Sequence, residues 1–165
     1  DLGQSPLASI RGWGVTNDAD HITAPSQGGK GLQRCITGAL AMDQMSTDTI
    51  GFINSHGTGT IFNDEMESQA VHALFDDSSA PLITSFKGSI GHTLGAAGVI
   101  ETVLSLGVLK NKVVPPSAGY ANSGVTYALN IPTIPTPCPQ LDTILCMKSG
   151  FGGINATLVL AEEER

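Results

Sequence analysis

The chain has 165 residues, a formal net charge of −7, 41% apolar and only 14% charged residues. This length fits one ordinary domain with a sizeable core, and the low charge predicts that a partner chain or domain covers much of the surface. The acidic balance and scattered basic residues exclude a nucleic-acid surface, and without a run of about 18 apolar residues we expect no membrane span.

The three cysteines are widely spaced and none has a C-x-x-C partner, so we expect neither a zinc site nor any other metal site. They fit a reduced, cytoplasmic compartment better than a disulfide framework, and no signal peptide is visible. The chain enters a strand pattern almost at once and has no initiator Met, so we expect a piece of a longer protein.

Hydrophobic periodicity predicts strands and helices that alternate along the chain. Strands are predicted at 7–13, 50–53, 82–84, 144–147 and 156–160. Helices are predicted from 32 to 42, at 64–75 and at 94–110, with loops at 17–31 and 111–140. The alternation indicates an α/β layer fold with a mixed sheet covered by helices.

Two of these helices carry more specific predictions. Asp64 can cap the second, with Glu67 as its capping-box partner at the third helical position. The third helix, 94–110, is apolar nearly all round and is expected to be fully buried.

Three polar segments follow predicted strands. They are "HGTGT" with His56, "SFKGSIGHTLGAAG" with Lys87 and His92, and "SGFGGIN" around Phe151. Since sites in α/β sheets gather at the carboxyl ends of strands, the three segments could converge. Each also has a structural explanation, because a histidine after a strand, threonines in a turn and a glycine-rich hairpin are all common without any site.

The combination favours a site that stabilises an anion. His92 lies directly before a predicted helix, whose positive amino-terminal end disfavours imidazolium and keeps the ring a neutral N–H donor. Two neutral imidazoles suit an oxygen anion that forms during a reaction, and a buried Lys87 would add positive potential.

Four segments carry a resemblance to a known family: "DADHITAP", "HGTGTIFNDEMES", "SFKGSIGHTLGAAG" and "GFGGINATLVL". Their order and spacing resemble the C-terminal half of the β-ketoacyl-acyl carrier protein synthases, condensing enzymes of the thiolase fold. The most specific part is "HGTGT" followed by K-x-x-x-x-H-x-x-G-A-A-G. The resemblance covers nearly all of residues 1–165 and implies one C-terminal ketosynthase domain, a mixed five-stranded sheet in an α/β/α layer arrangement.

The family's reaction is a decarboxylative Claisen condensation of malonyl-carrier protein with an acyl-cysteine. The resemblance implies that His56 and His92 donate hydrogen bonds to the malonyl thioester carbonyl as it becomes an enolate. Lys87 matches the lysine that supports this pair, and Glu67 matches its acidic partner.

Other residues match substrate contacts of the family. Thr58 and Thr60 match hydroxyls that bind the phosphopantetheine arm, and Thr23 matches a further contact more loosely. Phe151 matches the aromatic gate, whose backbone N–H forms part of the oxyanion hole, and Gly152 lets that turn approach the thioester.

The chain departs from the family where "N-S-F-G-F-G-G-T-N" is usual. Met147, Lys148 and Ser149 replace the Asn, Ser and first Phe, so we expect the acyl pocket or the movement of the gate to differ.

The nucleophilic cysteine of the family lies in its N-terminal half. Cys35, on a predicted helix face, Cys138, in a loop, and Cys146, in a strand, do not match it. The resemblance therefore implies an acyltransferase that is incomplete and inactive alone, with an apolar helix face made for the missing half.

The resemblance also implies partners: an acyl carrier protein, the N-terminal half, and a homodimer or ketosynthase heterodimer. The substrate would be attached to the 4′-phosphopantetheine of the carrier protein, and the synthase itself would have no covalently bound cofactor. A non-catalytic partner subunit of the chain-length-factor kind is the alternative, and a thiolase using coenzyme A ranks lower. Fatty acid and polyketide pathways both stay open.

Overall fold

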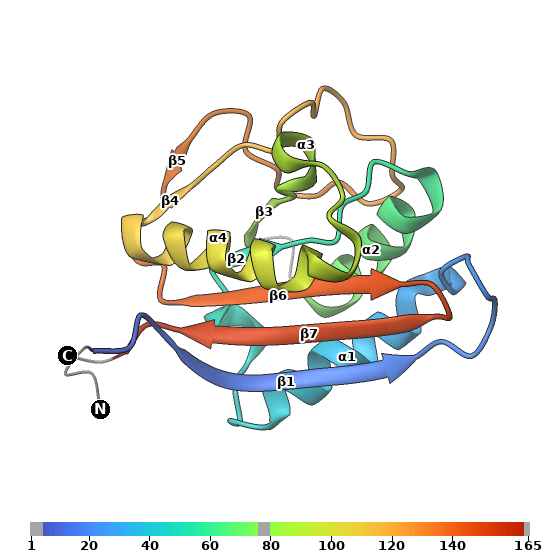
Figure 1. The fold of residues 1–165 in the computed structure, drawn as a ribbon, viewed down its shortest axis with the longest axis horizontal. Helices are drawn as coiled ribbons and strands as arrows, with labels where there is room; N and C mark the ends of the chain where they lie inside the picture. The colour runs from blue at the N-terminus through green and yellow to red at the C-terminus, as the bar shows by residue number, and fades with distance from the viewer. Residues whose placement is uncertain (1–4, 76–79, 164–165) are drawn as a thin grey trace.

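The computed structural model describes residues 5–75 and 80–163, and its centre is one mixed five-stranded sheet (Figure 1). The ends of the predicted 1–165 domain, residues 1–4 and 164–165, lie outside the described residues. The strand order is β1-β7-β6-β2-β3. Its strands are β1 (Ser9–Asn17), β2 (Phe52–Asn54), β3 (Leu82–Thr84), β6 (Thr143–Gly150) and β7 (Ile154–Ala161).

Helices cover both faces of this sheet. The α-helices are α1 (Lys30–Ala41), α2 (Ile61–Leu74), α3 (Lys87–Ile90) and α4 (Ala97–Asn111). Short 3-10 turns are η1 (Gln27–Gly29), η2 (Thr47–Thr49) and η4 (Leu94–Ala96), and β4 (Val113–Val114) pairs with β5 (Thr136–Pro137).

The alternation of side chains along the central strands divides the core into two. Ile53 and Leu145 pack with α1 and α2, and α1 lies behind β1 and β7 in Figure 1. Their neighbours Phe52 and Ile144 point the other way and pack with residues of α4. This period of two is what a sheet buried on both faces requires. The predicted layered α/β arrangement is therefore confirmed.

The predicted elements are present, with shifted ends. The first strand was predicted at 7–13 and is formed by Ser9–Asn17, and the short helix α3 and the β4–β5 pair were not predicted. The predicted cap at Asp64 is wrong, because α2 already begins at Ile61 with Thr60 as N-cap. Asp64 lies inside the first turn, where its N–H donates to the Thr60 carbonyl.

The expectation that the helix at 94–110 is fully buried is also wrong for this chain. One side of α4 packs on the sheet, whereas Val99 is 71% and Val103 60% exposed on the other. By length and composition alone the segment Leu94–Asn111 could cross a membrane. Glu101 in its middle is fully buried and paired with lysines from other elements, which fits a core helix better. Its exposed apolar side matches the predicted face for a partner.

Strand direction brings the three polar segments to one edge. β2 runs parallel to both β3 and β6. The residues that follow these strands, 55–60, 85–92 and 151–153, therefore leave the sheet at the same edge, as the sequence indicated.

Candidate active site

Two histidines meet at this edge of the sheet. His56 follows β2 and is buried, whereas His92 lies between α3 and η4 and is exposed. Their ring centroids are 5.5 Å apart and the rings are nearly perpendicular, at 83°. The structure thus brings together two imidazoles that lie 36 residues apart in the sequence.

The surroundings act on the two rings in different ways. The pKa of His56 falls from 6.5 to about 3, first because the ring is buried and then because Lys87 and Lys148 place positive charge nearby. Nδ1 of His92 accepts a hydrogen bond from the Leu94 N–H at 3.1 Å, which leaves its proton on Nε2.

The cause predicted for this neutrality needs correction. His92 does not adjoin the long helix, because η4 intervenes and α4 begins only at Ala97. The helix end was predicted to act on His92, whereas the low pKa of His56 comes from burial and from the charges of Lys87 and Lys148.

Two lysines share one buried carboxylate beside the histidines. Lys87 Nζ lies 2.7 Å from Glu101 Oε1, and Lys148 Nζ lies 2.6 Å from Glu101 Oε2. Glu101 is 0% exposed and Lys87 only 8%, which excludes the alternative of a solvated surface charge for Lys87. Because the two ammonium groups face one carboxylate, the cluster can present net positive charge to an anion.

Glu67 holds the turn that carries His56. Its Oε1 accepts from the His56 N–H at 2.6 Å and its Oε2 from the Gly57 N–H at 2.7 Å. The predicted capping-box role is wrong, since these bonds lead to the preceding turn and not to the start of α2. Burial raises the pKa of Glu67 from 4.5 to about 7, against the opposing effect of the two N–H donors.

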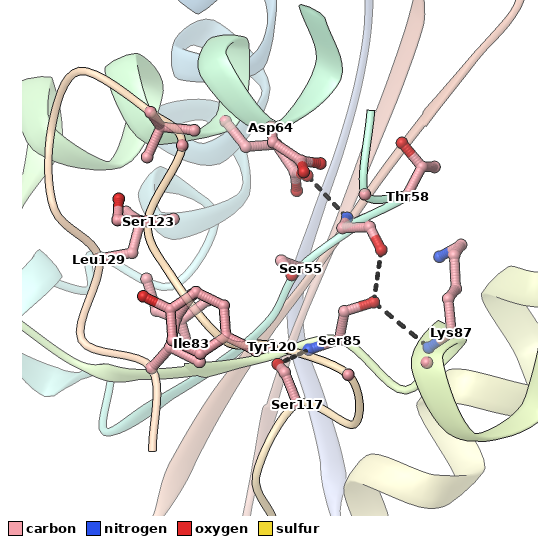
Figure 2. Close-up of a pocket in the computed structure, with 18 of the residues that line it drawn as sticks. Ser55, Thr58, Asp64, Ile83, Ser85, Lys87, Ser117, Tyr120, Ser123 and Leu129 are labelled. Atoms are coloured by element: carbon pink, nitrogen blue, oxygen red, sulfur yellow. Dashed lines mark hydrogen bonds between the residues drawn. The ribbon is translucent and has the colours of Figure 1, made fainter. Parts of the chain in front are cut away.

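A cavity of about 710 Å³ opens beside these groups (Figure 2). Thr58, Glu67, Lys87 and His92 line one part of it, and Ile83 is among the apolar residues that line it. This combination of an apolar lining with a few polar groups is typical of a small-molecule site.

Serine side chains tie the walls of the cavity together. Ser85 Oγ donates to the Gly57 carbonyl at 2.7 Å and accepts from the Lys87 N–H at 3.3 Å, and Ser117 Oγ accepts from the Ser85 N–H (Figure 2). The turn with His56 and the segment with Lys87 are therefore directly linked. Thr58 Oγ1 and Thr60 Oγ1 lie 2.8 Å apart at the partly exposed start of α2.

The remaining predicted residues form a second group at the β6–β7 turn. Phe151 is 80% exposed, and the Gly152 N–H donates to the Ile22 carbonyl at 2.6 Å, so it is already bonded. Thr23, next to Ile22, donates its own N–H to His21 Nδ1. Among the described residues no hydrogen bond joins this group to the histidine pair.

Three residues of the site were missed by the sequence reasoning. Glu101 and Asn54 were not considered, and Lys148 was noted only as a departure from the family's motif. Asn54 Nδ2 donates to the Glu101 carbonyl at 3.0 Å and Asn54 Oδ1 accepts from Lys148. A lone acid inside an apolar helix needs a buried partner, and that signal could have identified Glu101.

None of the three cysteines is among the residues that line the cavity, although Cys146 Sγ lies 4.0 Å from Asn54 Nδ2. Cys35 and Cys146 are buried in the core, and burial raises the pKa of both thiols. Raised pKa values are the opposite of what a nucleophilic thiolate needs.

Comparison with known proteins gives a consistent result. Residues 7–121 match the family model described as beta-ketoacyl synthase, C-terminal domain. The 3-oxoacyl-(acyl-carrier-protein) synthase 2 of Rhizobium meliloti (strain 1021) is 36% identical over 159 residues, which cover 96% of this chain and 38% of that protein. The 3-oxoacyl-(acyl-carrier-protein) synthase 1 of Escherichia coli (strain K12) is 41% identical over 159 residues, covering 96% and 37%.

Solved structures agree with these relatives. A type II PKS acyl-carrier protein in complex with its ketosynthase, bound to the hexaketide, matches with a TM-score of 0.89 and 31% identity over 98% of this chain and 40% of that chain. The ishigamide ketosynthase/chain length factor matches with a TM-score of 0.90 and 29% identity over 98% and 40%. The chain spans about two fifths of the length of these relatives. It has the thiolase-like fold and belongs to the beta-ketoacyl synthase family, where it corresponds to the C-terminal domain.

Proposed function

We propose that this chain supplies the His56, His92 and Lys87 set of a 3-oxoacyl-acyl carrier protein synthase. The observation that carries the proposal is the pair of imidazoles 5.5 Å apart beside a cavity lined by Lys87. The substrate would be a malonyl group in thioester linkage to the phosphopantetheine of a carrier protein. The E. coli and Rhizobium relatives bear the name of this activity.

In the proposed reaction the malonyl carboxylate leaves as CO₂ and its C–C electron pair becomes an enolate. His56 and His92 stabilise the enolate oxygen as N–H donors, an effect worth about 3–4 kcal/mol for one well-placed donor. The enolate carbon then attacks an acyl-cysteine thioester, a C–C bond forms, and the cysteine leaves as a thiolate. A neutral His56 suits this role over the whole physiological pH range.

The nucleophilic cysteine belongs, in this proposal, to another part of the protein. We propose that the chain alone does not condense acyl groups, and that the exposed side of α4, with Val99 and Val103, packs against that part. Homodimerisation or pairing with a second ketosynthase subunit, and a cytoplasmic location, are further parts of the proposal. Thr58 and Thr60 would contact the phosphopantetheine, with Thr23 and Phe151 at the approach to it.

The test uses the full-length protein that carries this chain, an acyl donor and malonyl-carrier protein. We expect a 3-ketoacyl product by mass spectrometry, and loss of CO₂ release by about 10²–10³-fold in His56→Ala. Product formed by residues 1–165 alone would contradict the proposal that the nucleophilic cysteine belongs to another part of the protein.

A second candidate is a partner subunit of the chain-length-factor kind. Two structural relatives are ketosynthases with chain length factors, and the chain departs from the usual motif at Met147, Lys148 and Ser149. A full-length protein without a reactive cysteine, inactive until a second ketosynthase is added, would favour this candidate.

A further inference from the structure

Lys148 is held by oxygens from two elements next to the histidine pair. Its Nζ lies 2.6 Å from Glu101 Oε2, 2.8 Å from the Ser55 carbonyl and 3.1 Å from Asn54 Oδ1. The side chain is 15% exposed. Three oxygen acceptors satisfy the three N–H donors of an ammonium group.

The bond to Ser55 has a consequence for His56, because both belong to one peptide group. The carbonyl of that group accepts from Lys148 at 2.8 Å, and its N–H donates to Glu67 Oε1 at 2.6 Å. The Lys148 ammonium group and the Glu67 carboxyl group therefore hold the two sides of the peptide plane from which the His56 side chain departs. Since the plane cannot rotate without losing one of these bonds, the backbone from which the His56 side chain departs is restrained as well.

Charge balance alone does not account for Lys148. Glu101 already has Lys87 at 2.7 Å, so a second ammonium is not needed to neutralise it. Burial lowers the pKa of Lys148, and the Glu101 carboxylate opposes this effect. Placing the Lys148 ammonium group here therefore carries a desolvation cost. What Lys148 adds beyond Lys87 is the pair of bonds to Ser55 and Asn54 at the end of β2.

We propose that Lys148 is a positioning residue, which together with Glu67 clamps the Ser55–His56 peptide and so fixes the His56 imidazole relative to His92. This inference rests on the function proposed above. Because three protein oxygens already occupy the Lys148 ammonium group, Lys148 acts through the Ser55–His56 peptide and not on the substrate.

The test compares Lys148→Met with wild type in the full-length protein. We expect kcat for malonyl decarboxylation to fall by about 10- to 100-fold, because small misplacements of a catalytic group have effects of that size. The KM for the malonyl thioester should stay within about twofold of wild type, since uniform binding is untouched. Lys110→Met, an exposed lysine at the end of α4, is the matched control and should behave like wild type.

Two further measurements keep the proposal testable. Ammonium chloride should partly restore Lys148→Ala, because NH₄⁺ can donate to the same three oxygens, whereas tetramethylammonium, which has no N–H, should not. Hydrogen exchange of the His56 amide should be faster in Lys148→Met than in wild type, and this measurement needs no activity.

The outcomes separate the two proposals. A wild type that never decarboxylates malonyl thioester overturns the proposed function, while the exchange rate of the His56 amide still decides whether the clamp exists. An active wild type with an unchanged kcat and unchanged exchange in Lys148→Met overturns the clamp and leaves the function intact. A variant that loses substrate affinity instead of kcat also overturns it.

Discussion

Glu67 holds the turn that carries His56. Replacing it by glutamine tests whether burial or the two backbone N–H bonds have the larger effect on the pKa of Glu67. Both carboxylate oxygens accept backbone N–H bonds, at 2.6 and 2.7 Å. A glutamine presents one oxygen and one NH₂ group, so either the His56 or the Gly57 N–H would face another donor. A buried donor left without an acceptor costs about 1–3 kcal/mol, which is the loss of stability expected from geometry alone.

The pH dependence gives the second and sharper expectation. Burial raises the pKa of Glu67 in the folded protein to about 7, from a reference of 4.5. Between these two values the folded state keeps a proton that the unfolded state has released, so stability falls as pH rises through this window. The full difference corresponds to about 3 kcal/mol. Glutamine does not titrate, and the variant should lack this slope.

The penalty of Glu67→Gln should therefore be largest at or below pH 4.5 and should shrink as the pH rises to about 7. Urea unfolding of both full-length proteins over this range measures it, and Glu163→Gln makes the same chemical change at an exposed position as a control. If the penalty grows with pH instead, the two N–H bonds outweigh burial, the pKa of Glu67 lies below its reference, and the reasoning is refuted.

Three other predictions concern different parts of the chain. His92→Ala should reduce decarboxylation by about 10²–10³-fold, measured as CO₂ release; an activity within about twofold of wild type would remove His92 from the proposed mechanism. Gly88→Ala should lower the melting temperature of the full-length protein, because a Cβ at that position would lie 1.9 Å from the Ala118 carbonyl oxygen, while Gly98→Ala, with nothing within 4 Å, should not. Val103→Glu should weaken self-association of residues 1–165 in sedimentation experiments, because Val103 is 60% exposed on the apolar side of α4; a clean monomer before the substitution would contradict the expectation.

Most of the fold was predictable because its elements have clear local signals. The apolar runs at 144–147 and 156–160 predicted two strands, and the proline-rich stretch after α4 was correctly expected to lack long elements. The errors lie where tertiary contacts decide. The start of α2 could not be read from a capping residue, because no side chain caps it: Thr60 occupies the N-cap without a side-chain bond.

The site was predictable in part, and the division follows the kind of interaction. Histidines after strands are visible as motifs, so His56 and His92 were found. The partner of Lys87 was not, because an ion pair between α3 and α4 depends on how these helices cross and leaves no pattern in either segment. Lys148 was visible as a change in a motif, but its contacts with β2 depend on the parallel pairing of β2 with β6.

The buried charged groups of the site contribute more to the orientation of a peptide group than to the stability of the fold. Removing Lys87, Lys148 and Glu101 from water carries a desolvation cost that their mutual attraction only partly offsets, so apolar residues of similar size could stabilise the fold equally well. What apolar residues could not do is orient a peptide group. The Ser55 carbonyl is bonded to Lys148 and the His56 N–H to Glu67, and these two bonds restrain the orientation of the peptide group. The proposed stabilisation of an enolate needs donors that are already in place before the charge develops, and the proposed clamp would supply such preorganisation for His56.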